Sequence, residues 1–146
     1  MNNLARNGYA IGRSGQLLLG AYSLILLFGF GVAFCLEPSP NGYGTHQQLG
    51  LPPCTFRMLF GISCPSCGMT TSFSHFVRGQ FLQSIDANAA GFLLALVCVL
   101  QIPWCWWSIY RGCFWGVWQP AKAFVWLLAT FCAATLINWC VGLLTI

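Results

Sequence analysis

Residues 16–36 read QLLLGAYSLILLFGFGVAFCL and contain no charged side chain. A helix of about 20 apolar residues can cross the hydrocarbon core of a bilayer. This run is also longer than the ~7 to 15 apolar residues of a secretory signal peptide, so we interpret it as a retained span. Two more uncharged runs cover residues 88–107 and 123–146. The sequence therefore predicts an all-α membrane protein with three transmembrane helices in a single domain, residues 1–146.

The composition of the chain favours lipid as its main solvent and excludes several functions. Of the 146 residues, 58% are hydrophobic and 5% are charged, whereas soluble domains carry about 25% charged residues. The formal charge of +4 is scattered, and nucleic-acid binding needs several basic residues on one face. Glu37 and Asp86, the two acidic residues, cannot supply the catalytic sets of hydrolases or kinases.

The basic residues predict the orientation in the membrane. Four lie before the first run or between the second and third, namely Arg6, Arg13, Arg111 and Lys122. Only Arg57 and Arg78 lie in the long segment 37–87. The positive-inside rule places the more basic side in the cytoplasm. We therefore expect a cytoplasmic N-terminus, with segment 37–87 and the C-terminus outside the cytoplasm.

Residues 64–68 read CPSCG, a CxxC motif followed by glycine. Proline is favoured at the first position of a helix, so we expect a short helix from Pro65 to Arg78, with Cys67 in its first turn. The amides of that turn would stabilise a thiolate at Cys64 or Cys67, as in dithiol oxidoreductases. The sequence around the motif shows no βαβ pattern of the thioredoxin type.

Two other interpretations of the motif stay open. In the first, CPxCG is one half of a zinc site, with Cys54 as third ligand and His75 or His46 as fourth, although no second CxxC is present. In the second, Cys54 forms a structural disulfide with Cys64 or Cys67, which an oxidising compartment permits. Zinc is the only cofactor that the sequence suggests.

The residues after the motif alternate in polarity at helical spacing. The predicted polar stripe consists of Thr71, Ser74, His75 and Arg78. The apolar stripe on the opposite side consists of Met69, Phe73, Phe76 and Val77. This pattern is typical of an interfacial amphipathic helix that lies on the bilayer with its polar side towards water. Arg78 and Gly79 are expected to end this helix.

The segment from Cys54 to Asn88 resembles domain-of-unknown-function family 2752, a family of small bacterial membrane proteins. Its pattern is a cysteine, about nine residues, CPxCGxT followed by arginine, a short helix ending in Arg-Gly, and Asn-Pro opening the next span. The matching residues are Cys54, Cys64, Pro65, Cys67, Gly68, Thr70, Arg78, Gly79 and Asn88. Thr71 replaces the usual arginine and Ala89 the usual proline. The resemblance implies a bacterial inner-membrane protein with a cysteine-centred motif, and it supplies no reaction.

Small size favours an accessory role over catalysis, because three helices enclose little polar surface. We expect association with a membrane protein or a second copy of the chain, through the face around Gly29 or through Asn138. The alternative is a membrane thiol-disulfide oxidoreductase or zinc-binding protein that uses Cys54, Cys64 and Cys67.

Overall fold

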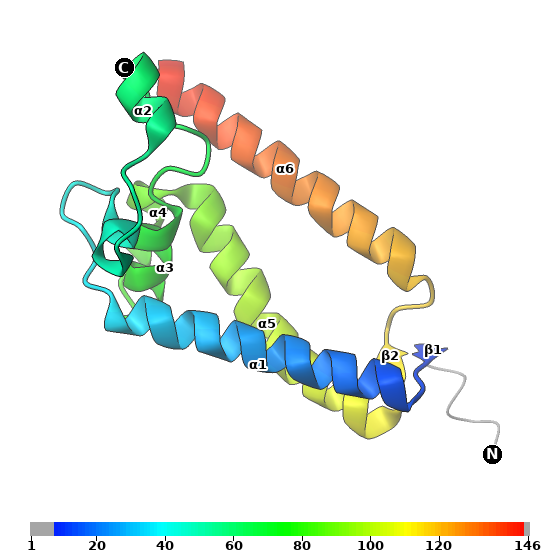
Figure 1. Cartoon of the computed structure of the whole chain (residues 1–146). Helices are drawn as coiled ribbons and strands as arrows, with labels where there is room; N and C mark the ends of the chain where they lie inside the picture. Colours follow the sequence, from blue (N-terminus) through cyan, green and yellow to red (C-terminus); the bar gives the residue numbers. More distant parts are fainter. Residues whose placement is uncertain (1–7, 145–146) are drawn as a thin grey trace. The chain divides into compact units, whose positions relative to one another are not determined.

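The computed structural model describes residues 8–144, which are mostly helical (Figure 1). The long helices are α1 (Arg13–Cys35), α5 (Ala89–Arg111) and α6 (Pro120–Leu144). The shorter helical elements are η2 (Thr45–Leu49), α2 (Thr55–Phe60), α3 (Met69–Val77) and α4 (Phe81–Ala87). The strands β1 (Gly8–Ala10) and β2 (Cys113–Trp115) are three residues each.

The prediction of three spans is confirmed. Among the described residues, three helices are long and apolar enough to cross a membrane, over Arg13–Cys35, Ala89–Arg111 and Pro120–Gly142. The second continues through Pro103 and ends four residues later than expected. We therefore treat the chain as a membrane protein. Arg6, one of the residues used to predict the orientation, lies outside the described residues.

The chain divides into two compact units, of which the first combines residues 1–29 with residues 97–130. In this unit, polar side chains of α1 and α5 pair with each other. Tyr22 Oη donates to Gln101 Oε1 at 2.5 Å, and Trp106 Nε1 donates to Ser23 Oγ at 3.1 Å. Such pairing is what polar groups in a span require, because lipid offers them no partner.

The first unit also holds a two-stranded antiparallel sheet that the sequence did not predict. Strands β1 and β2 pair with Tyr9 opposite Phe114. Trp104 stacks on Phe114 with ring centroids 5.9 Å apart and donates through Nε1 to the carbonyl of Trp115 at 3.0 Å. The sheet thus joins the segment before α1 to the loop after α5.

The second unit combines residues 30–96 with residues 131–146, and several small hydroxyl side chains are fully buried in it. Ser72 Oγ lies 2.9 Å from Ser84 Oγ, where α3 packs on α4. Thr71 Oγ1 lies 2.8 Å from Thr45 Oγ1 of η2. All four residues are fully buried. Because each hydroxyl has a partner, burial costs little, and the small side chains let the backbones approach closely.

The orientation predicted for the polar side of α3 is wrong. Thr71 and Ser74 are fully buried instead of facing water. Short hydroxyl side chains fit between packed helices, and the Thr71 hydroxyl is paired with Thr45, whereas the Ser74 hydroxyl has no hydrogen-bond partner among the described residues. On the apolar side, Phe73 stacks on Phe30 of α1 at 5.8 Å, and Phe76 packs edge-on against Phe92 of α5 at 5.7 Å. Helix α3 therefore contacts protein on both faces.

Arg78 ends α3 as predicted and also caps α1. Its Nη1 donates to the carbonyl of Ser74 at 2.8 Å, and its Nη2 donates to the carbonyl of Phe34 at 2.7 Å. The last carbonyls of a helix have no partner within the helix, and the last turn of α1 contains no basic residue. Arg78 supplies this charge from a distant part of the sequence.

Candidate cysteine site

Residues 64–68 form a tight turn that precedes the helix. The amide of Cys67 donates to the carbonyl of Cys64 at 3.0 Å, and the amide of Met69 donates to the carbonyl of Ser66 at 3.2 Å. Gly68 follows with φ 84° and is the N-cap of α3. The expected helix start at Pro65 is therefore wrong by four residues, because the left-handed glycine separates the turn from the helix. Cys67 lies before the first turn of α3.

Gly68 lies where the chain leaves no room for a side chain. A Cβ atom there would lie 2.7 Å from the carbonyl oxygen of Gly42 and still closer to that of Ala87. The positive φ is itself a conformation that side chains disfavour. Two independent constraints thus require glycine at this position of the motif.

Asn88 attaches the cysteine turn to the start of α5. Its Nδ2 donates to the carbonyl of Cys67 at 2.9 Å and to that of Pro65 at 3.4 Å. Its Oδ1 accepts the amide of Gly91 at 2.9 Å. Asn88 is buried, so its amide group is used in full inside the protein and fixes the turn from behind.

Cys54 is the N-cap residue of α2 and is paired with Cys64. The backbone N–H of Arg57 is the main cause that lowers the pKa of the Cys54 thiol, while burial opposes it and a hydrogen bond from the Cys64 thiol adds to it. Burial, followed by the bond to Cys54, raises the pKa of the Cys64 thiol. The side chain of Cys54 forms no hydrogen bond to the first-turn amides of α2 as a neutral thiol. These amides therefore act mainly by stabilising the ionised form of the thiol. The two pKa values thus move in opposite directions, so Cys54 is the more easily ionised thiol of the pair and Cys64 the less easily ionised one.

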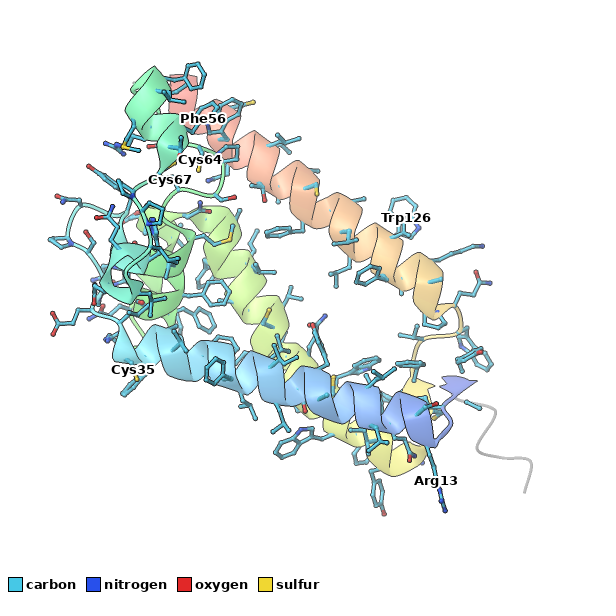
Figure 2. The ribbon with its side chains drawn as sticks, viewed as in Figure 1. Arg13, Cys35, Phe56, Cys64, Cys67 and Trp126 are labelled. Carbon is cyan, nitrogen blue, oxygen red and sulfur yellow. The ribbon has the colours of Figure 1, made fainter. Side chains whose placement is uncertain are left out.

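Two side chains hold the residue before Cys64 in place. Arg57 Nη1 donates to Ser63 Oγ at 3.0 Å, and Trp139 Nε1 donates to the Ser63 carbonyl at 2.7 Å. The Arg57 guanidinium also lies 3.7 Å from the centroid of the Tyr43 ring. Figure 2 shows Cys64 and Cys67 on the loop after α2, which carries Phe56. The segments that carry Cys54 and Cys64 are therefore fixed to each other.

Cavities meet at the cysteines. Cys54, Cys64 and Cys67 line a cavity of about 280 Å³ together with His46. Cys64 and Cys67 line a second cavity of about 360 Å³. Cys54, Cys67, His46 and Arg57 line a third of about 250 Å³. Arg57 thus supplies a guanidinium beside the cysteines.

The structure does not assemble all of the predicted site residues. His75 is bonded to Gln80, with Nδ1 2.6 Å from Oε1, and lines none of the cavities described above. His46 Nε2 lies 3.2 Å from the carbonyl of Pro52. Thr71, which replaces the usual arginine, is buried against Thr45 and does line the cavity of about 280 Å³ with the three cysteines. Arg78 is bonded to α1.

The residues proposed as zinc ligands do not form a ligand set in this arrangement. Among the described residues, no group of three or more His, Cys, Asp or Glu side chains is placed to hold a metal ion. A structural zinc site needs four ligands at about 2.0 to 2.3 Å. The three thiols share a cavity without converging on one point, so we derive no chemistry through zinc.

Sequence reasoning missed Arg57 and Trp139 as members of the site. Arg57 follows Cys54 by three residues, which places its amide in the first turn of any helix that Cys54 caps. That spacing was a usable signal. Trp139 is separated from Ser63 by 76 positions, and its sequence context as one tryptophan in an apolar run gives no indication of the contact.

Comparison with known proteins identifies one family. A family model described as "Protein of unknown function (DUF2752)" matches residues 54–102. The match begins at Cys54, contains the CPSCG turn and α3, and extends into α5, about a third of the chain. It shows the resemblance to this family and carries no activity. No curated protein and no solved structure matches the chain.

Proposed function

We propose that this membrane protein carries out thiol–disulfide exchange at Cys54, Cys64 and Cys67. The observation that carries the proposal is the pairing of two thiols of opposite character beside a third, all lining one cavity. A thiol exchanges efficiently when it is partly ionised near the ambient pH and has a second thiol within reach. The geometry favours this chemistry over the accessory role that chain size alone suggests.

The reaction follows from the polarity of the pair. The Cys54 thiolate attacks a disulfide of a partner protein, forms a mixed disulfide and expels one partner thiolate. The Cys64 thiol gives its proton to that leaving thiolate. The Cys64 thiolate then attacks the sulfur of Cys54, forms the Cys54–Cys64 disulfide and expels the second partner thiolate. Two electrons pass from the pair to the partner disulfide, and the reverse sequence oxidises a partner dithiol.

Cys67 supplies a second partner for Cys64. Both cysteines belong to the same turn and line two cavities in common. A Cys67 thiolate that attacks Cys64 in the Cys54–Cys64 disulfide forms a Cys64–Cys67 bond and releases Cys54 as thiolate. The motif can therefore pass a disulfide from one side of Cys64 to the other, which a purely structural cross-link does not need.

A redox titration of the detergent-purified full chain tests the proposal. The protein is equilibrated in glutathione buffers, alkylated and mapped by mass spectrometry, with the metal content measured on the same sample. We expect a Cys54–Cys64 bond that forms and breaks reversibly. Cys132→Ala, on α6 and outside the motif, is the control and should titrate as the parent does. Thiols that stay free in every buffer, a bond that no buffer reduces, or one zinc per chain would overturn the proposal.

An accessory role is the second candidate, and one observation favours it. Nothing lies within 4 Å of the position that a Cβ would take at Gly29, so this face of α1 is open to lipid or to another helix. Close approach at a glycine is a common mode of association in membranes. Gly29→Leu should abolish a dimer or complex seen by cross-linking, whereas Gly31→Leu, another open position on α1, should preserve it.

We further propose a bacterial inner-membrane location with a cytoplasmic N-terminus. The support is the family resemblance together with Arg13, Arg111 and Lys122, which fall on one side of the spans when α1, α5 and α6 cross in turn. The cysteines then lie outside the cytoplasm, where disulfides persist.

A further inference from the structure

The largest of the three cavities at the cysteines, about 360 Å³, borders the ends of two spans. It is lined on one side by Cys64 and Cys67, on a second by the junction of α4 and α5, including Asp86, and on a third by Asn138 and Trp139 of α6. Ligand sites measure about 300 to 1,000 Å³. This volume suits a single ring head group better than a folded partner segment.

The cavity is lined in part by the ends of two candidate spans. Asn138 and Trp139 lie near the end of the third span, which covers Pro120–Gly142, and Ala89, another lining residue, begins the second. The lining therefore belongs partly to two helices that are long and apolar enough to cross a membrane, near their ends. With both helices across the bilayer, these ends lie near its surface, where a ligand dissolved in lipid can approach the cavity.

Asn138 marks the polar end of the ligand. Its amide makes no hydrogen bond within residues 8–144, although it lies on a membrane span and lines the cavity. A polar side chain in a span is costly without a partner. An amide N–H is a donor, so a ligand with a carbonyl oxygen satisfies it.

The charges of the cavity indicate a neutral ligand. Asp86 is the one charged residue among the described lining residues, and no Lys or Arg accompanies it. An anion such as a phosphate head group would be repelled. The thiols of Cys64 and Cys67 at the same cavity indicate a ligand that exchanges electrons with them.

We propose that this cavity binds the ring of a lipid-soluble quinone, which oxidises Cys64 and Cys67. This inference rests on the proposed thiol–disulfide function and names its electron acceptor. The Cys64 thiol adds to a ring carbon, and its proton passes to one quinone oxygen. The Cys67 thiol then attacks the Cys64 sulfur, the carbon–sulfur bond breaks, and the electron pair and the Cys67 proton go to the second oxygen. Two thiols and one quinone thus give one disulfide and one hydroquinone.

A decyl-chain benzoquinone is the probe for the test. Reduced full-length protein in detergent should reduce it, with loss of quinone absorbance and of two thiols per chain. Asn138→Leu should slow this reaction roughly fivefold, the effect of one lost hydrogen bond, and leave exchange with glutathione disulfide within about twofold. Thr135→Val is the matched control, because Thr135 lies on α6, bonds to its own helix and does not line the cavity.

The outcomes separate the two proposals. Exchange with glutathione disulfide but no reaction with the quinone overturns the quinone site and leaves the proposed function intact. Failure of both reactions overturns both. A photoreactive azidoquinone on the parent protein gives a result that needs no variant to fold. Label on residues 64–68 or 138–142 supports the site, and label confined to other peptides refutes it.

Discussion

The indole N–H of Trp139 donates a 2.7 Å hydrogen bond to the main-chain carbonyl of Ser63, the residue before Cys64. Trp139 also packs edge-on against Phe56, two residues after Cys54, at 6.4 Å. One side chain near the end of the third span thus contacts both segments that carry the paired cysteines. The distance between the two thiols therefore depends on α6.

Trp139→Phe should weaken the Cys54–Cys64 disulfide while it preserves an aromatic ring at this position. Loss of one hydrogen bond is worth about 1 kcal/mol, so the equilibrium constant for forming the disulfide should fall about fivefold. The glutathione titration measures it. Trp126→Phe is the matched control, because Trp126 lies on the same helix and is 70% exposed. Equal constants for the two variants would contradict a role of Trp139 in positioning Cys64.

The pH midpoints for alkylation of Cys54 and Cys64 should be shifted in opposite directions from that of an ordinary thiol. Because the pKa of Cys54 is lowered and the pKa of Cys64 is raised, Cys54 becomes a thiolate first as the pH rises. Its rate with iodoacetamide should reach half-maximum below the pH of an ordinary thiol, and that of Cys64 above it. Mass spectrometry of samples quenched along a pH series measures both rates.

Cys64→Ala should shift the Cys54 curve only partly back towards the ordinary value. The main cause of the lowered pKa is the backbone N–H of Arg57, which this variant keeps, whereas the smaller contribution of the Cys64 thiol is lost. A Cys54 curve that returns completely to that of a free thiol would show that the first turn of α2 has no part in its reactivity.

Gly68→Ala should destabilise the protein more than the same change at another glycine of positive φ. Both Gly68 and Gly79 are left-handed, with φ 84° and 73°, but only at Gly68 would a Cβ meet neighbouring carbonyls. Strain at φ alone costs about 1 kcal/mol, and the steric conflict adds to it. Thermal unfolding in detergent should show a larger drop in apparent Tm for Gly68→Ala. A similar drop for both would mean that the turn yields to the added methyl group.

The three spans and the cysteine motif could be predicted because their signals are local. Residues 16–36 carry no charge at any position, so this run is predicted to lie in the bilayer whatever its tertiary contacts are. The contacts of Arg57, Arg78 and Trp139 are different, because each depends on a segment that a single sequence does not bring near. The sequence contains these residues but does not indicate which distant segment each of them contacts.

The errors in the α3 region have one physical cause. Pro65 is a good first residue of a helix, and Thr71 and Ser74 are polar, so local rules place the helix start early and the polar side in water. Tertiary contacts override both preferences. Gly68 adopts a left-handed, non-helical conformation against the carbonyls of Gly42 and Ala87, and Thr71 forms a hydrogen bond with a buried hydroxyl group.

The orientation can be tested with two reagents that do not cross membranes. Lys122 is the one lysine of the chain and is exposed at the start of α6, while Cys54 lies between α1 and α5 in the chain. In intact spheroplasts treated first with a reductant to free the thiols, a maleimide should modify Cys54, whereas an amine reagent should modify Lys122 only after permeabilisation. The reverse pattern would place the cysteines in the cytoplasm, where disulfides are rare. That result would remove the support that the compartment gives to thiol–disulfide exchange and would favour metal binding at the same residues.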